Sequence, residues 1–437
     1  MTVHPDLRIG AMADLLAEAR ARTWQLVSPV SEDDLRRQHD PLMGPLIWDL
    51  GHIGHFEELW LTRNVDGVIE FGEMPGMFNP FEHPRRTRGE LDLPTLDEIR
   101  ASLSEIRERV LARLDDIDIS SAAHPLLRDG YVYAMVAQHE YQHNETMLQT
   151  LQLKLGDPYR PARRNPPPSV SLHIADGDMV RFPGGLVTIG TADRSAAYDN
   201  ERPVHRVELK PFLIDRGPVT NSEYLRFMED GGYVRRELWS LAGWDWLSGA
   251  RVNSPKYWYR RGNEWRQRVF DIDRPVGGPR PVCHVCYYEA EAFANWAGKR
   301  LPNEFEWEAA AAWNAETGRA QRFPWGDEDA TASIANVDQL SFDTAPLGSY
   351  ARNVSPIGCY GMIGDVWEWT SSNFNGYPGF EAFPYPEYSQ VFFGSEYKVL
   401  RGGSFATRPG AIRNSFRNWD YPIRRQIFSG FRCVRDD

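Results

Sequence analysis

Cysteine is scarce in this chain of 437 residues, with only Cys283, Cys286, Cys359 and Cys433. Four cysteines are too few to cross-link a protein of this size, which argues against a disulfide-stapled scaffold. Cys283 and Cys286 form a C-x-x-C pair, but a zinc site of this type needs a second such pair, and the sequence has none. The apolar run at residues 282–288 therefore predicts a buried strand in which both act as small hydrophobic residues.

Long apolar runs and an excess of positive charge are also missing. No stretch approaches the ~20 apolar residues that a membrane helix requires, and the first residues lack the apolar core of a signal peptide. We therefore expect a soluble, cytoplasmic protein. The 49 Lys and Arg residues are outnumbered by 61 Asp and Glu residues, for a formal net charge of −12. This balance argues against general binding to nucleic acid or to anionic membranes.

The apolar pattern changes once along the chain, which predicts two domains. Residues 1–156 show helical periodicity. Helices are expected at residues 7–27, 45–63, 96–114 and 130–155. Four amphipathic helices of this length predict an antiparallel bundle. The long connection at residues 64–94 is rich in Pro, Gly and Arg, and a loop of this length is usually functional or mobile.

A proline-rich linker is expected at residues 157–175, because five of its first twelve residues are Pro and prevent a helix. In residues 176–437, short apolar runs between Gly, Pro, Asn and Trp replace the helical period. Helices are expected only at residues 220–230, 289–297 and 303–313. This texture predicts an α+β domain with much irregular structure.

Histidines on the apolar faces of two predicted helices indicate a metal site. His139 and His143 are four residues apart, so both imidazoles project from one face of the fourth helix. A hydrogen-bonded structural pair is the alternative, but imidazole is the commonest side-chain metal ligand. On the second helix, His52 and His55 both offer a third ligand. Three neutral imidazoles leave open positions that suit Fe(II) or Zn(II).

Glu140 completes a literal H-E-x-x-H motif with His139 and His143. In metalloproteases this motif binds zinc through both histidines and uses the glutamate as general base. The five-residue pattern is weakly specific, and no later helix offers a clear third ligand. The sequence therefore argues against a protease.

Both halves resemble known folds. The N-terminal half resembles a DinB-like four-helix bundle, with metal positions in Leu50-Gly51-His52 and in His139-x-x-x-His143. The C-terminal half resembles the formylglycine-generating-enzyme fold, an irregular α+β relative of C-type lectins. The motifs that carry this second resemblance are Pro183-Gly184-Gly185, Pro218-Val219-Thr220-Asn221, Pro324-Trp325-Gly326, Gly364-Asp365-Val366-Trp367-Glu368-Trp369 and Leu400-Arg401-Gly402-Gly403-Ser404, together with residues 199–203 and 300–308. So many motifs in order are specific for the fold.

The combination of the two domains resembles the ergothioneine-biosynthesis sulfoxide synthases. These non-haem Fe(II) enzymes use O₂ to join a cysteinyl thiol to the imidazole C2 of hercynine. The resemblance implies that His52, His139 and His143 bind the iron, and it places Gln142 beside the iron and the hercynine imidazole. The expected partners are hercynine, γ-glutamylcysteine and O₂, without nucleic acid or membrane. The oligomeric state stays open, and a monomer is consistent with the sequence.

The same resemblance implies the substrate residues. Asn418 and Trp419 match the positions that surround the quaternary ammonium of hercynine, which favours an aromatic face and polar oxygens. Core packing is the alternative for Trp419. The donor γ-glutamylcysteine carries two carboxylates and one ammonium, which call for Arg side chains and an acid. The family pattern assigns this task to four residues, although a solvated arginine is the usual alternative in a loop. They are Arg85, Arg88, Asp420 and Arg424.

Tyr385 is the residue that the resemblance implies as catalytic. A phenol close to the iron can supply a proton or an electron while O₂ is reduced. Tyr377 and Tyr388 lie nearby in the sequence and are the alternatives.

Several other functions compete with this interpretation. A sister enzyme would use free cysteine or a selenium sugar as the donor, and the presence of the four donor residues disfavours it. A zinc-dependent thiol transferase with a DinB-like site would need neither O₂ nor the second domain. The cysteine oxidation that formylglycine-generating enzymes perform needs a Cys pair after the Arg-Gly-Gly-Ser motif, and Ser404 is followed here by Phe405-Ala406-Thr407. A lectin-like domain could also serve only to bind ligands.

Overall fold

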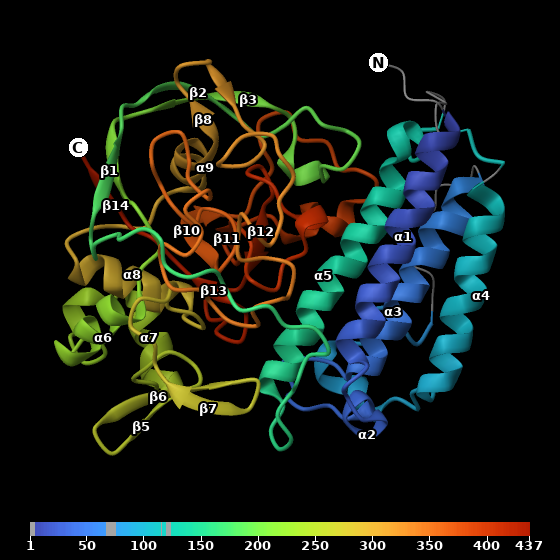
Figure 1. Ribbon diagram of the computed structural model, residues 1–437, viewed down its shortest axis with the longest axis horizontal. Helices are drawn as coiled ribbons and strands as arrows, with labels where there is room; N and C mark the ends of the chain where they lie inside the picture. Colours follow the sequence, from blue (N-terminus) through green and yellow to red (C-terminus); the bar gives the residue numbers. More distant parts are fainter. Residues whose placement is uncertain (1–4, 67–75, 115, 119–123) are drawn as a thin grey trace. The chain divides into compact units, whose positions relative to one another are not determined.

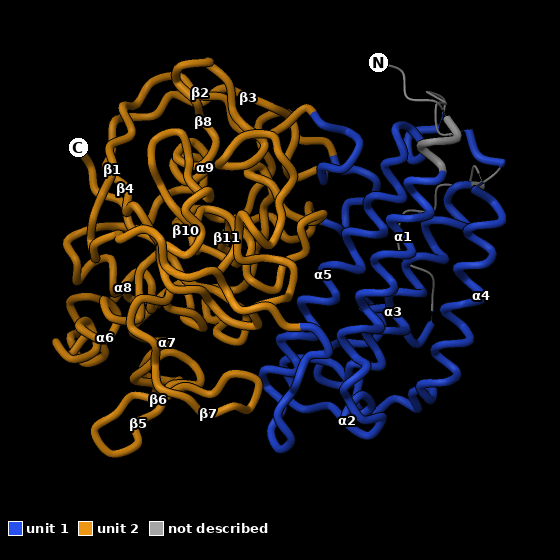
Figure 2. The backbone as a smooth tube through the Cα atoms, in the orientation of Figure 1, with its two compact units in different colours: residues 1–163, 193–198, 382–388 blue, residues 164–192, 199–381, 389–437 orange. Residues whose placement is uncertain are grey.

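The computed structural model describes residues 5–66, 76–114, 116–118 and 124–437 (Figure 1). The chain forms two compact units (Figure 2). Unit 1 consists of Met1–Arg163, Asp193–Tyr198 and Ala382–Tyr388, and unit 2 contains the rest. The domain expected at residues 1–156 lacks the two short later segments that pack with the first unit. Such long-range packing leaves no local pattern in the sequence.

Unit 1 is a bundle of four long helices that lie side by side in Figure 1. Helix α1 packs along α5, and α3 packs along α4 and α5. The helices are α1 (Pro5–Val27), α3 (Leu46–Glu58), α4 (Leu96–Leu114) and α5 (Tyr131–Leu153), with the short α2 (Glu32–Arg36). A π-helical turn, η1 (Leu59–Arg63), extends α3, and short 3₁₀ turns include η2 (Asn64–Asp66), η3 (Arg85–Glu90) and η4 (Arg128–Gly130). The predicted bundle is therefore confirmed.

Close approach of α3 to α4 depends on Gly54. A Cβ atom at this position would lie 2.5 Å from Leu103 Cδ2, which is well inside van der Waals contact. Apolar side chains of α4 fill the seam at intervals of three and four residues, as an amphipathic helix requires. They are Ile99, Leu103, Ile106 and Val110. The seam holds α3, which carries His52, in a fixed place within the bundle.

Unit 2 contains small sheets and four helices with long irregular connections. One sheet has the order β1-β4-β14 (Met179–Phe182, Phe212–Asp215, Val434–Asp436) and another β12-β11-β10-β13 (Asn418–Asp420, Lys398–Arg401, Trp367–Asn373, Ser429–Gly430). The remaining strands are β2 and β3 (Gly185–Ile189, His205–Leu209), β5 to β7 (Trp258–Arg261, Glu264–Val269, Ile272–Pro275), and β8 and β9 (Trp313–Asn314, Arg319–Ala320). The helices are α6 (Asn221–Glu229), α7 (Leu241–Ala250), α8 (Tyr287–Trp296) and α9 (Glu304–Ala312). The predicted α+β class is confirmed.

The strand expected at residues 282–288 is wrong. Only Pro281 makes an isolated bridge, and helix α8 begins at Tyr287. Cys286 is the cap residue of this helix, and its backbone N–H donates to Glu289 Oε2 at 2.8 Å. The apolar run is buried by helix capping rather than by sheet pairing, which periodicity alone does not distinguish. All four cysteines are free, and Cys286 is buried as expected.

Buried ion pairs explain several motifs of unit 2. Glu368 accepts from Arg432 Nε and from Trp307 Nε1, both at 2.7 Å, and all three side chains are buried. Arg417 pairs with Glu304 at 2.7 Å in the same interior. Buried charges persist only when they are paired and hydrogen-bonded. These motif residues therefore hold the fold. Among the described residues, no helix is long and apolar enough to cross a membrane.

Candidate metal centre

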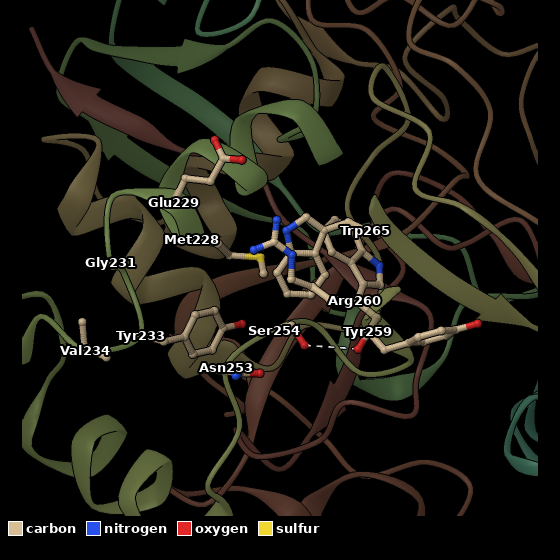
Figure 3. Close-up of a pocket in the computed structure, with 11 residues that line it drawn as sticks. Met228, Glu229, Gly231, Tyr233, Val234, Asn253, Ser254, Tyr259, Arg260 and Trp265 are labelled. Carbon is tan, nitrogen blue, oxygen red and sulfur yellow. Dashed lines mark hydrogen bonds between the residues drawn. The ribbon is translucent and has the colours of Figure 1, made fainter. Parts of the chain in front are cut away.

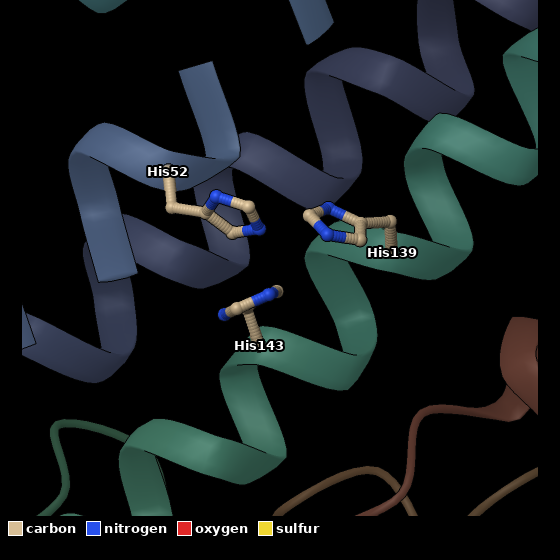
Figure 4. A group of neighbouring side chains, drawn as sticks. All are labelled: His52, His139 and His143. Carbon is tan, nitrogen blue, oxygen red and sulfur yellow. The ribbon is translucent and has the colours of Figure 1, made fainter. Parts of the chain in front are cut away.

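Three histidine side chains from two helices of unit 1 converge on one point (Figure 4). His52 comes from α3, while His139 and His143 lie one turn apart on α5. One nitrogen of each ring lies within 4.8 Å of the corresponding nitrogen of the other two. This spacing suits three ligands of one metal ion. The structure thus brings together the three histidines that the sequence singled out.

His52 is oriented by the loop that connects α3 to α4. The backbone carbonyl of Phe78 lies 2.8 Å from His52 Nδ1, so this nitrogen is the donor and Nε2 is left for the cluster. The Trp48 indole stacks on the imidazole with ring centroids 5.0 Å apart. Gly51 makes room for the loop, since a Cβ there would lie 2.2 Å from the Phe78 ring. A glycine is therefore required before His52 in the Leu50-Gly51-His52 motif, because any larger residue would collide with Phe78.

The other two ligand candidates have different supports. His143 Nδ1 lies 3.0 Å from Asp49 Oδ1, which again leaves Nε2 for the cluster. The His139 ring stacks on Phe56 with centroids 3.7 Å apart. A backbone carbonyl, a carboxylate and an aromatic face thus hold three imidazoles in fixed orientations. Such outer contacts set ligand orientation and basicity in metal sites.

Burial favours the neutral form of two of the three imidazoles. Desolvation lowers the pKa of His52 and of His139 well below the ordinary value, and repulsion from His143 adds to the effect. Neutral imidazole is the form that binds a metal. Because the free nitrogens are neutral donors without thiolates, the residues fit a divalent first-row metal such as Fe(II) or Zn(II).

His55 is not a member of the cluster. Its ring centroid lies 6.2 Å from that of His52, and it is not part of the group of three converging nitrogens. Of the two histidines that spacing alone left open, His52 is the one that lies in the group.

The hydrogen-bond partners of Glu140 are residues of α1 rather than the three histidines. Its carboxylate accepts from Arg20 Nε at 2.8 Å and from Thr23 Oγ1 at 2.6 Å, and it is buried between α5 and α1. A general base must reach the water that it deprotonates. The H-E-x-x-H pattern is therefore not a protease site here, because its glutamate joins a structural ion-pair network.

Two tyrosines of the segment Ala382–Tyr388 pack on helices of the bundle within unit 1. Gln142 Nε2 donates to Tyr388 Oη at 3.3 Å. Tyr385 is buried, and its ring stacks on Trp60 at 5.0 Å. Trp60 contacts Phe56, which stacks on His139. Both tyrosines thus lie in the aromatic surroundings of the histidine cluster.

Arg85 and Arg88 lie on the 3₁₀ helix η3, where residues three apart share one face. Arg88 is buried, with its guanidinium 3.3 Å from the centroid of the Trp48 ring and its Nε donating to the His83 carbonyl at 2.9 Å. Arg85 is exposed. Arg85 is thus a solvated arginine, the usual alternative for an arginine in a loop, whereas Arg88 is not.

The remaining predicted substrate residues lie together in unit 2, on or just after β12. Trp419 stacks on Phe374 with centroids 4.1 Å apart, and its backbone N–H is held by Asn418 Oδ1 at 2.9 Å. Asp420 and Arg424 form an ion pair at 3.3 Å. One short segment therefore carries an aromatic face, an amide, an acid and a guanidinium.

Unit 2 also holds a cavity of about 750 Å³ between the end of α6 and the β5–β6 hairpin (Figure 3). Its walls include Tyr233, Trp258, Arg260 and Trp265. None of the predicted site residues lines it. Tyr377, the third tyrosine considered, is buried elsewhere in unit 2 beside His205, with ring centroids 4.5 Å apart.

Sequence reasoning missed two contributors. Asp49 directs His143, and the Phe78 carbonyl directs His52. Asp49 stands three residues before His52 on the same helix, so helical spacing could have found it. The Phe78 carbonyl comes from a loop and left no pattern. Tyr388 was considered only as an alternative to Tyr385, and its contact with Gln142 was not expected.

Comparison with known proteins supports both halves. Residues 15–147 match the DinB superfamily model, and residues 169–437 match the model of the sulfatase-modifying factor enzyme 1-like domain. A hercynine oxygenase of Mycobacterium tuberculosis is 44% identical over 425 residues, which cover 96% of this chain and 97% of that protein. One from Mycolicibacterium thermoresistibile is also 44% identical, over 97% of this chain and 94% of its own. A formylglycine-generating enzyme of Thermomonospora curvata is 32% identical, over 60% of this chain.

Proposed function

Because this chain belongs to the hercynine oxygenase family, we propose that it joins the thiol of γ-glutamylcysteine to the imidazole C2 of hercynine with O₂. The product is a sulfoxide-linked adduct. The observation that supports this activity best is the convergence of His52, His139 and His143 within a chain that matches these oxygenases from end to end. All four cysteines are free, as in a reducing compartment, and we place the reaction in the cytoplasm.

The three imidazoles would hold Fe(II). Bound Fe(II) would supply O₂ activation and a position for the thiolate sulfur, since three protein ligands leave positions open. The protein supplies a site in which Asp49 and the Phe78 carbonyl fix the free nitrogens before a metal arrives. Such preorganisation lowers the cost of binding.

Residues around the cluster would place hercynine and move a proton. Gln142 and Tyr388 already contact each other and offer an amide and a phenol to the substrate imidazole. Tyr385, buried against Trp60, would supply a proton or an electron to the reacting centre. In unit 2, Trp419 offers its ring and Asn418 its amide to the quaternary ammonium.

The donor would be recognised by its charges. Arg85, Arg88 and Arg424 would bind its two carboxylates, and Asp420 its ammonium. Asp420 and Arg424 form an ion pair with each other, so one short segment can offer both an acid and a guanidinium to the donor. Free cysteine has only one carboxylate and would use fewer of these residues.

The chemistry balances with O₂ as the only oxidant. Loss of the C2–H and S–H hydrogens and formation of the C–S bond remove two electrons, and oxygenation of the sulfur removes two more. One oxygen atom stays in the sulfoxide, and the other leaves as water with the two hydrogens. No reductant is needed.

The test is O₂ consumption with mass spectrometry of the products. Anaerobically prepared Fe(II) protein is given hercynine with γ-glutamylcysteine, or hercynine with cysteine. A sulfoxide-linked adduct from the first pair alone is the expected result. A product from cysteine alone would contradict the donor assignment, and a lack of O₂ uptake with both pairs would contradict the oxygenase activity.

A pair of variants refines the donor test. Arg424→Ala should raise the KM for γ-glutamylcysteine with little change in the KM for hercynine, because Arg424 is assigned to a carboxylate of the donor. Arg109→Ala, which removes an exposed arginine paired with Glu58 on α3, is the matched control and should change neither value. An equal rise in both KM values for Arg424→Ala would contradict a donor-specific role.

A further inference from the structure

Asp49 is a buried carboxylate with only half of its hydrogen-bonding capacity used. Its side chain is 2% exposed. Oδ1 lies 3.0 Å from His143 Nδ1, but Oδ2 is buried without any hydrogen-bond partner among the described residues. The only ion-pair partner of Asp49 among the described residues is the imidazole of His143, which is charged only when it is protonated. A carboxylate in this state is costly, because burial removes its hydration without replacing it.

The local helix does not explain this position. Asp49 is in the first turn of α3, where a negative charge is favoured by the helix dipole. Neither carboxylate oxygen accepts from a free N–H at the start of the helix, since the single hydrogen bond of this side chain goes to α5. The side chain therefore faces the histidine cluster rather than its own helix end.

A divalent cation at the cluster would balance the charge of Asp49. Imidazole binds a metal in its neutral form, so a divalent ion held by these three side chains would bring two positive charges that none of them offsets. The nearest carboxylate to compensate them is one hydrogen bond away, behind His143. A carboxylate that accepts from a ligating imidazole also raises the basicity of that ligand and fixes its tautomer.

We propose that Asp49 is a positioning residue of the metal centre: it orients His143 through Nδ1 and supplies the negative charge that retains a divalent metal on neutral ligands. This inference rests on the proposed metal site. The three proposed ligands then differ in basicity. His143, which is hydrogen-bonded to a carboxylate, donates electron density to the metal most strongly, whereas His52 is hydrogen-bonded only to a backbone carbonyl.

The comparison of Asp49→Asn with the native protein tests this role. The amide keeps the shape and an acceptor for His143 but removes the charge. The control is Glu58→Gln, on the same helix, where a half-buried carboxylate pairs with Arg109. Co(II) and Fe(II) affinities are measured anaerobically by competition with a chelator. Asp49→Asn should bind both metals about 10- to 100-fold more weakly, and Glu58→Gln should bind as the native protein does.

The melting temperature without metal separates this role from a structural one. If the charge of Asp49 serves to retain a cation, the metal-free Asp49→Asn variant should have a melting temperature no lower than that of the metal-free native protein. Only the increase in melting temperature on addition of Co(II) should be smaller. A purely structural aspartate predicts the reverse: a lower apo melting temperature and an unchanged rise with metal. Asp49→Ser, which also removes the charge, repeats the comparison if the amide is not accommodated.

Each outcome has a distinct meaning. Native metal affinity in both Asp49 variants would overturn the inference and leave the metal site intact. Failure of the native protein to bind either metal would overturn the proposed site itself, and the role of Asp49 with it. Weaker binding with an undiminished apo melting temperature supports both.

Discussion

Arg20 Nε lies 2.8 Å from Glu140 Oε1, although Glu140 directly follows His139 in the sequence. Arg20 also reaches Glu57 at 2.7 Å, and Arg107 pairs with the same glutamate at 2.6 Å. All four side chains are buried or nearly so. Helices α1, α3, α4 and α5 are thus tied by one charge network.

Removal of Arg20 should destabilise the bundle strongly. Arg20→Ala leaves two buried glutamates with Arg107 as their remaining cation, and breaking a buried pair costs about 3–5 kcal/mol of unfolding free energy. Urea unfolding measures this loss. Arg109→Ala breaks an exposed pair with Glu58 and should cost less than about 1 kcal/mol. Equal losses in both variants would show that the network adds nothing beyond surface pairing.

Glu140→Gln should preserve turnover per bound metal within a few-fold. The carboxylate is engaged by Arg20 and Thr23 and does not reach the reacting centre. Loss of a general base would instead lower the rate by about 10²–10⁴-fold. The measurement is the rate of sulfoxide formation divided by metal content, below the melting temperature of the variant. A rate loss of about 10²-fold or more would show that Glu140 acts as a general base in the reaction.

Comparison of His52→Ala with His55→Ala should show which of these two histidines binds the metal. The first removes one of three converging nitrogens and should abolish stoichiometric Fe(II) binding after gel filtration. The second removes a ring that lies outside the group and should keep it. Metal analysis of the two proteins decides the question. Retained iron in His52→Ala with loss in His55→Ala would reverse the assignment.

The sequence predicted the helical bundle, the α+β domain and the histidine cluster because each has a local pattern. Two histidines four residues apart must share a helix face. The Phe78 carbonyl and the packing of Tyr385 against η1 and of Tyr388 against α5 depend on loops far along the chain, and no periodicity encodes such contacts. The run at residues 282–288 had the composition of a strand, but capping by Glu289 turned it into a helix start.

Tyr385→Phe should divert the reaction from sulfoxide formation toward oxidation of the thiol alone. The variant keeps the ring that stacks on Trp60, so packing is preserved and only the hydroxyl is lost. Tyr388→Phe is the matched comparison, because its hydroxyl contacts Gln142 and should affect hercynine binding more than the product ratio. Mass spectrometry gives the ratio of adduct to oxidised thiol. A native ratio and rate in Tyr385→Phe would remove its catalytic role.

Asp365, in the interior of unit 2, should make stability depend on pH. Burial raises the pKa of its carboxyl from the ordinary 3.8 to about 6, although Ala345 N–H and Asn336 Nδ2 donate to it at 2.7 Å. Since the folded state holds this proton more tightly than the unfolded state, the contribution of Asp365 to stability is largest at low pH and falls as pH rises through about 6. A shift of about two pKa units corresponds to about 3 kcal/mol.

Asp365→Asn isolates this effect from the other carboxylates, because the amide accepts the same two hydrogen bonds and does not titrate. The difference in unfolding free energy between the variant and the native protein should grow in favour of the variant from about pH 4 to about pH 7, and then level off. Urea unfolding at several pH values gives this difference directly. A constant difference across the range would show that Asp365 has the same pKa folded and unfolded, and that its buried hydrogen bonds offset the loss of hydration in full.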